Sequence, residues 1–159
     1  MHYHIRPLAP DEHSLLPAFL LESIYIPAGA ERPPASFVGT PEMQVYLRDF
    51  GREKDDWALA AEVDGQVAGI IWARIMDDYG HLDDATPSLA MSVLPGYRRQ
   101  GIGSSLLRAM LELLRSNGYA RTSLSVQKAN TAACRLYEKA GFCPEVDHPD
   151  EWIMACRLQ

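Results

Sequence analysis

The sequence lacks three features that would place it at a membrane or on nucleic acid. It has no hydrophobic run long enough to cross a bilayer, because the most apolar early stretch, residues 15–26, contains Pro17 and Glu22 and a spanning helix needs about 20 apolar residues. It has no excess of positive charge, since its formal net charge is −6. It also has no internal repeat or low-complexity tract. We therefore expect neither membrane nor nucleic-acid binding, and the acidic balance favours a cationic substrate.

Cysteine is also scarce and its spacing is uninformative. The three cysteines, Cys134, Cys143 and Cys156, are odd in number and form no C-x-x-C pair. With no signal-like segment at the start of the sequence, they are interpreted as reduced thiols of a cytoplasmic protein. The histidines have no metal-ligand spacing, so we predict no metal site.

The remaining pattern alternates between strands and helices over a length, 159 residues, that suits a single domain spanning 1–159. Period-2 stretches predict strands, and apolar residues at helical spacing predict helices. The expected strands are 3–6, 57–63, 66–76, 89–94, 122–126, 142–146 and 152–158; the expected helices are 11–25, 41–50, 106–117 and 130–140. The fold class is therefore α/β.

The most informative stretch is residues 89–107, where a mostly apolar strand ends at Pro95 and leads through a glycine-rich turn into a helix. The first N–H groups of a helix have no partner within it and carry partial positive charge. Glycine allows an anion to approach the backbone without meeting a Cβ atom. No Lys-Ser/Thr follows the glycines and no third glycine completes a dinucleotide fingerprint. The 98–104 turn therefore predicts a phosphate site, although glycines at a turn also occur for purely structural reasons.

Two motifs resemble those of the GNAT N-acetyltransferase superfamily. The first, Arg98-Arg99-Gln100-Gly101-Ile102-Gly103 after Val93-Leu94-Pro95, resembles its acetyl-CoA signature Arg/Gln-x-x-Gly-x-Gly/Ala. The second is residues 130–142, NTAACRLYEKAGF, in the family's order and spacing. The resemblance implies a GNAT-like mixed, strongly twisted sheet of six to seven strands, flanked by about four helices in three layers. It also implies a sheet that splays beside strand 89–94.

The resemblance implies an acyl-CoA-dependent N-acyltransferase that transfers acetyl from acetyl-CoA to a primary amine by direct attack in a ternary complex. A non-catalytic acyl-CoA-binding sensor is the alternative from another class, and a small nucleotide-phosphate binder is a third. Cofactor contacts are expected from the main chain near the central strand, from the 98–104 turn and from the next helix. These residues are Met91, Ser92, Val93, Arg98, Arg99, Gln100, Gly101, Ile102, Gly103, Ser104, Asn130, Ala133 and Tyr137.

The helix from residue 130 carries the candidate general acid. Asn130, Ala133 and Tyr137 share one helical face by their spacing. Asn130 also suits an N-cap and Tyr137 a packed aromatic. In the family, the tyrosine at the Tyr137 position donates a proton to the departing CoA thiolate.

The general base is not selected by the sequence. A primary amine with a pKa near 10.4 must lose its proton before attack, at a cost of about 4–5 kcal/mol at pH 7. The candidates are Glu62, Glu22 and His81, together with Asp83 and Asp84 in the acidic loop. Each is equally compatible with an ordinary surface role, and the acidic loop is an alternative site of attraction for a cationic acceptor.

The family pattern divides the chain into an acceptor-side half, 1–86, and an acetyl-CoA-binding half, 87–159. The acceptor, a small-molecule or peptide amine, is expected against residues 19–47, the acidic loop 77–84 and residues 147–152. Four aromatic residues are candidates for its pocket, or else for the core: Tyr25, Phe37, Tyr46 and Trp72. A homodimer is an option common to such folds, but the sequence carries no interface signature.

Overall fold

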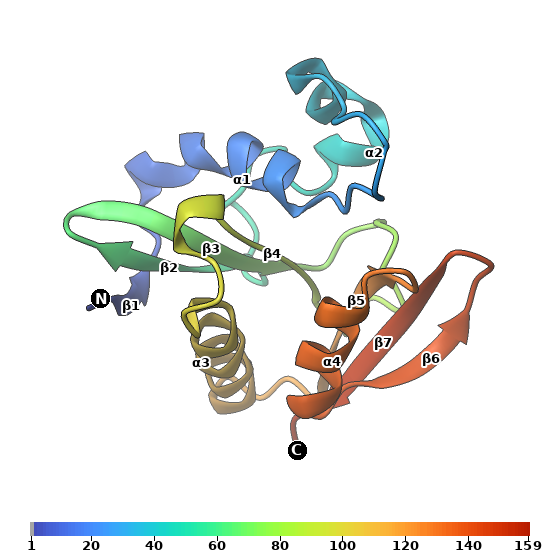
Figure 1. Ribbon diagram of the computed structural model, residues 1–159. Helices are drawn as coiled ribbons and strands as arrows, with labels where there is room; N and C mark the ends of the chain where they lie inside the picture. Colours follow the sequence, from blue (N-terminus) through green and yellow to red (C-terminus); the bar gives the residue numbers. More distant parts are fainter. Residues whose placement is uncertain (1) are drawn as a thin grey trace.

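The computed structural model describes residues 2–159, which form a seven-stranded sheet covered by helices on both faces (Figure 1). The strand order is β1-β2-β3-β4-β5-β7-β6. The strands are β1 His4–Pro7, β2 Trp57–Val63, β3 Gln66–Arg74, β4 Ser88–Val93, β5 Arg121–Gln127, β6 Cys143–Asp147 and β7 Glu151–Arg157. The α-helices are α1 Leu16–Ser23, α2 Pro41–Gln44, α3 Ile102–Ser116 and α4 Thr131–Lys139. In the described part of the chain, no helix has the length and apolar character needed to cross a membrane.

Alternating side chains of the central strands bury both faces of the sheet. Ala60, Ile70 and Trp72 belong to the core beneath α1 and α2. Leu59 and Ile71 belong to the other core, beneath α3 and α4. Figure 1 shows α1 and α2 over one face and α3 and α4 over the other. This arrangement confirms the three-layer α/β architecture expected from the sequence.

The sheet is interrupted between β4 and β5. These neighbours are parallel and share a single register pair, Ser88 with Ser123. The amide of Ser123 donates to Pro87 O at 3.0 Å, and beyond this pair the two strands diverge. At the same place Gly80 packs so closely on the β5 backbone that a Cβ there would lie 2.9 Å from the carbonyl carbon of Leu124. The splay expected beside the central strand is therefore present.

Three helices differ from their predicted bounds. The region predicted as helix 11–25 is a 3₁₀ segment, Pro10–Leu15, followed by α1. Pro17 accounts for the break, since it occupies the first turn of α1, where its missing N–H costs nothing. The predicted helix 41–50 ends as an α-helix at Gln44 and continues as turns. By contrast, α3 begins at Ile102, earlier than the predicted Leu106.

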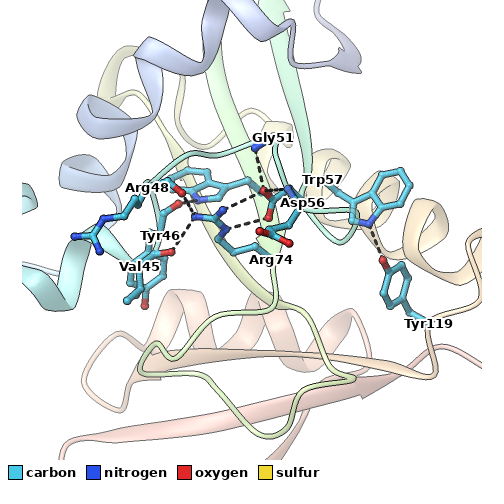
Figure 2. Close-up of polar contacts among 10 residues, drawn as sticks. Val45, Tyr46, Arg48, Gly51, Asp56, Trp57, Arg74 and Tyr119 are labelled. Atoms are coloured by element: carbon cyan, nitrogen blue, oxygen red, sulfur yellow. Dashed lines mark hydrogen bonds and ion pairs between the residues drawn. The ribbon is translucent and has the colours of Figure 1, made fainter.

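A buried arginine fixes the turns after α2 on the sheet (Figure 2). Arg74 of β3 makes a bidentate ion pair with Asp56, with both N–O distances 3.0 Å. Its remaining nitrogen donates to the carbonyls of Val45 and Arg48 at 3.1 and 2.9 Å. These carbonyls lie just after a helix end, where a cation is favourable. Arg74 therefore holds the segment that follows α2.

Candidate active site

A cavity of about 630 Å³ lies where β4 and β5 separate. An interrupted sheet leaves space between strands that would otherwise be filled by a ladder. One wall comes from these strands and α4: Leu89, Ala90, Met91, Leu124, Ser125, Val126, Gln127, Asn130, Ala133 and Tyr137. The other walls come from the α1–α2 region, the β3–β4 loop and the β6–β7 turn: Leu20, Ser23, Ile24, Tyr25, Phe37, Met43, Tyr46, Tyr79, His148, Pro149, Asp150 and Glu151.

The β4 backbone presents unpaired groups to this gap. Leu94 N donates to Ala68 O of β3 at 2.8 Å, so the backbone N–H and C=O groups of the even-numbered residues of β4 point toward β3. In an antiparallel ladder the backbone groups of the odd-numbered residues then point away from β3, toward the other neighbouring strand. Met91 and Val93 therefore direct their N–H groups toward the gap, where β5 has already diverged. This strand edge can pair with an extended ligand.

The 98–104 turn forms a concave set of backbone donors beside this edge. In the structure of residues 2–159, none of the N–H groups from Arg99 to Ser104 donates to another backbone group. Positive φ values at Arg99 (62°) and Gly101 (84°) bend the chain into the start of α3. Successive free N–H groups at a helix N-terminus are suited to a phosphate oxygen.

The side chains predicted around the turn have different positions. Arg98 Nε donates to Val93 O at 2.8 Å and its Nη2 lies 3.3 Å from Glu22. Arg98 therefore braces the turn, although it is exposed like Arg99 and Gln100. Ser92 points away from the gap and donates to Phe19 O at 2.7 Å. The anion-binding capacity of the turn thus comes mainly from its main chain.

Helix α4 places the three predicted residues on the cavity wall. Asn130 caps the helix, since its Oδ1 accepts from Ala133 N at 3.3 Å. Asn130, Ala133 and Tyr137 all line the cavity. Tyr137 packs edge-on against Phe142, with ring centroids 5.8 Å apart. Burial, with a smaller contribution from Cys134, raises the pKa of Tyr137 to about 12, so the phenol stays protonated and can act only as a donor near neutral pH.

The three named base candidates do not line the cavity. Glu62 lies toward the sheet edge, where it accepts from Arg6 at 3.0 Å. Glu22 is bonded to two arginines, with Arg32 at 2.8 Å. His81 lies 3.5 Å from Asp84 in the β3–β4 loop.

The rest of the acidic loop has structural partners. Asp83 accepts from Arg121 at 2.7 Å and from Thr86 at 2.7 Å. The hydrogen bond from Arg121 is the main reason that the pKa of Asp83 is lowered to about 2. Asp84 is exposed and is not part of the cavity lining. Within residues 2–159, no group of three or more His, Cys, Asp or Glu side chains is placed to hold a metal ion.

The aromatic part of the cavity lining combines predicted and unpredicted residues. Tyr25, Phe37 and Tyr46 line it, whereas Trp72 is fully buried and donates to Tyr46 O at 3.2 Å. The tightly buried Trp72 therefore supports the wall instead of forming it. Sequence reasoning also missed Ser125 and Arg74. Alternation along β5 could have placed Ser125 toward the gap, but only the tertiary structure reveals the ion pair of Arg74.

The geometry matches a known family. The acetyltransferase (GNAT) family model matches residues 26–142, which is more than half of the chain. This chain belongs to the GNAT acetyltransferase family. The opening of the sheet beside β4 agrees with the splay that the resemblance to this family implied.

Individual GNAT relatives agree with this assignment. A mycothiol acetyltransferase from Stackebrandtia nassauensis is 35% identical over 118 residues, covering 68% of this chain and 38% of the relative. An N-alpha-acetyltransferase from Sulfurisphaera tokodaii is 38% identical over 116 residues, covering 63% and 68%. The chain thus spans under two fifths of the length of that mycothiol enzyme. PaiA N-acetyltransferase from Thermoplasma acidophilum, solved in complex with coenzyme A, has the same fold: TM-score 0.72, 21% identity, 99% of each chain covered.

Proposed function

We propose that this GNAT chain is an acetyl-CoA-dependent N-acetyltransferase that acts on a primary amine by direct attack in a ternary complex. The observation that carries the proposal is the interruption of the sheet between β4 and β5, with a cavity in the gap and free backbone donors at its side. Residues 87–159 supply the cosubstrate side and residues 1–86 most of the acceptor side.

The residues present fit acetyl-CoA. The N–H groups from Arg99 to Ser104 suit its diphosphate, since they are unpaired and successive. The edge of β4 at Met91 and Val93 suits the amides of its pantetheine arm, which can pair as an extra strand does. Asn130 and Ala133 border the same gap. Within the run from Arg99 to Ser104, Ile102 and Gly103 are the first two residues of α3.

The cosubstrate supplies an acetyl thioester, and the chain's own groups prepare its transfer. The Met91 N–H points into the gap and is positioned to polarise the thioester carbonyl. Such a donor contributes about 3 kcal/mol when aimed at developing negative charge. The raised pKa of Tyr137 keeps its hydroxyl protonated near neutral pH, and we assign this hydroxyl the role of general acid toward the leaving sulfur.

Removal of the amine proton is assigned to the acceptor end of the cavity. Glu62, Glu22 and His81 lie outside the lining, and the two glutamates are already ion-paired. His148, Asp150 and Glu151 line the cavity at the β6–β7 turn. We propose that one of these groups, directly or through water, accepts the proton before attack.

The decisive experiment is release of free thiol from acetyl-CoA in the presence of a panel of primary amines. We expect amine-dependent release and an N-acetylated product detectable by mass spectrometry. Parallel melting experiments should show greater stabilisation by CoA than by ATP, since saturation at 100 Kd adds about 2.7 kcal/mol. CoA binding without turnover of any amine would favour the sensor alternative, and preferential stabilisation by ATP would contradict the cofactor assignment.

A further inference from the structure

The lining of the cavity has a one-sided charge. Among residues 2–159, it includes two acidic residues, Asp150 and Glu151, together with His148, but no lysine or arginine. Both residues lie at the β6–β7 turn, which lines one end of the cavity. A ligand group entering this end therefore meets negative charge with no fixed cation to oppose it.

Three cations outside the lining are paired with acidic residues. Lys128 is paired with Asp147, and its ammonium lies 4.2 Å from the centroid of the Trp152 ring. Arg32 and Arg98 both pair with Glu22 on α1. Each of these cations already has an acidic partner, so a ligand carboxylate in the cavity would rely on neutral donors to repay its lost hydration.

The lining is also rich in aromatic residues. Four of them come from the α1–α2 region and the β3–β4 loop: Tyr25, Phe37, Tyr46 and Tyr79. Behind them lies Asp78, whose Oδ1 is buried without a hydrogen-bond partner, and burial raises its pKa. Aromatic rings accommodate an apolar body and attract a cation to their faces. They supply no positive charge to a carboxylate, although the tyrosine hydroxyls can donate hydrogen bonds.

From this arrangement we propose that the acceptor is a cationic primary amine on an apolar or aromatic body that carries no carboxylate near the amine. Arylalkylamines, amino-acid amides and the N-terminus of a peptide meet this description, whereas free amino acids do not. The inference rests on the proposed acetyltransferase function and adds the class of acceptor. The selectivity is the difference between the affinity for an amine without a neighbouring carboxylate and the affinity for an amino acid. Asp150 and Glu151 create it mainly by disfavouring the amino acid.

The test compares phenylalaninamide with phenylalanine, which share shape and differ in the charge beside the amine. We expect kcat/KM to be at least tenfold higher for the amide. Phenylethylamine is the third substrate, because it lacks the carboxylate and its amine is more basic than that of phenylalanine. It should also exceed phenylalanine, which would exclude ease of deprotonation as the cause. Binding of all three to the CoA-loaded protein, measured by calorimetry, gives the same ranking without turnover.

Charge reversal at the turn should change this ratio. Glu151→Lys provides a cation inside the cavity and is expected to lower the amide-to-acid preference at least fivefold. The ratio is the right readout, because loss of a proton acceptor would slow both substrates together. Glu145→Lys is the matched control: Glu145 lies on β6 of the same hairpin, exposed and outside the cavity lining. It makes the same change in net charge and should leave the ratio unaltered.

The outcomes separate the two hypotheses. Equal use of phenylalanine and its amide, with both acetylated, would overturn the acceptor class and leave the acetyltransferase function intact. An equal change of the ratio in both lysine variants would also overturn it, since the effect would come from net charge alone. Failure to acetylate any of the three amines or the wider panel, with no binding preference, would overturn both proposals.

Discussion

At the scale of single residues, Gly103 separates the requirements of folding from those of binding. A Cβ built on Gly103 would lie 3.7 Å from Met91 Cε and 4.0 Å from Leu136 Cδ2, which are ordinary contacts. The fold therefore tolerates a side chain there, but that side chain would enter the space between β4 and α4. Gly101 is different, because its φ of 84° is strained for any residue with a Cβ.

Gly103→Ala should keep or increase stability, since replacing glycine within a helix gains roughly 0.5–1 kcal/mol. Gly103→Leu should fill the space beside Met91 and weaken CoA binding at least tenfold. Gly101→Ala should cost about 1–2 kcal/mol of folding free energy through its left-handed backbone. Urea unfolding and CoA calorimetry on the same samples provide the two readouts. Unchanged CoA affinity in the leucine variant would contradict the proposed path of the cosubstrate.

Tyr137→Phe should lower kcat without abolishing it. A phenol of ordinary pKa near 10 already gains no driving force when protonating a thiolate of pKa near 8.5, a mismatch of about 2 kcal/mol. Burial raises the pKa of Tyr137 further, to about 12, so its benefit lies in positioning a proton. The difference between the variant and the parent should therefore persist as the pH rises to 10. Stopped-flow measurement of thiol release tests this, and a variant with full kcat would exclude the role.

At the scale of elements, the ion pair of Arg74 with Asp56 ties the turns after α2 to the sheet (Figure 2). The Asp56 side chain is only 1% exposed. Arg74→Met would leave this carboxylate buried without its partner, which costs about 3–5 kcal/mol. Because Met43 and Tyr46 of this region line the cavity, the same variant should raise KM for the amine more than KM for acetyl-CoA.

A double variant, Arg74→Met with Asp56→Leu, is the control for this prediction. It removes both charges, so it should be more stable in urea than Arg74→Met alone. If the double variant lost as much folding free energy as the sum of the Arg74→Met and Asp56→Leu losses, each measured alone, the residues would not act as a pair.

Element types were more predictable from the sequence than element boundaries. Alternation indicated the strands around Asp64-Gly65, and the unpaired N–H groups of α3 followed from the glycines that precede it. The region 11–25 is divided into a 3₁₀ segment and α1 because Pro17 occupies the first turn of α1. Periodicity of apolar residues alone does not indicate this division. The α2 region was harder, because its continuation as turns depends on the distant Arg74 binding the carbonyls of Val45 and Arg48.

Site residues were predictable where they belong to contiguous motifs. Asn130, Ala133 and Tyr137 share a face by spacing alone, and the structure places them together on the cavity wall. The acceptor end draws on segments separated by more than a hundred residues, such as Tyr25 and Glu151. No local pattern specifies which of their side chains meet, so the proton acceptor could not be selected from the sequence.

At the scale of the whole molecule, stability should fall on acidification as paired carboxylates are protonated. Arg6 binds Glu12 through two nitrogens, at 2.7 and 2.8 Å, and lowers the pKa of Glu12 from 4.5 to about 2. A carboxylate with a depressed native pKa stabilises the fold above its unfolded pKa, and this contribution disappears as the pH falls through the native value.

Glu12→Gln should therefore destabilise the protein by about 1 kcal/mol at pH 7, and the deficit should shrink between pH 4.5 and pH 2. Urea midpoints measured across that range test the sign. The control is Glu42→Gln, because Glu42 is exposed in the first turn of α2. This variant makes the same change in net charge and should show a much smaller deficit at pH 7. An equal deficit would assign the effect to net charge.

The single register pair between β4 and β5 should also affect the rate at which backbone amides exchange with solvent. Amide protons at the centre of a sheet are normally the slowest to exchange with deuterium, whereas those of an outer strand exchange readily. In this chain Met91 and Val93 are central in strand order, but their amides have no neighbour across the gap. These two amides should therefore exchange as those of an edge strand do, and deuterium should label them long before the amides of the well-paired strands on either side.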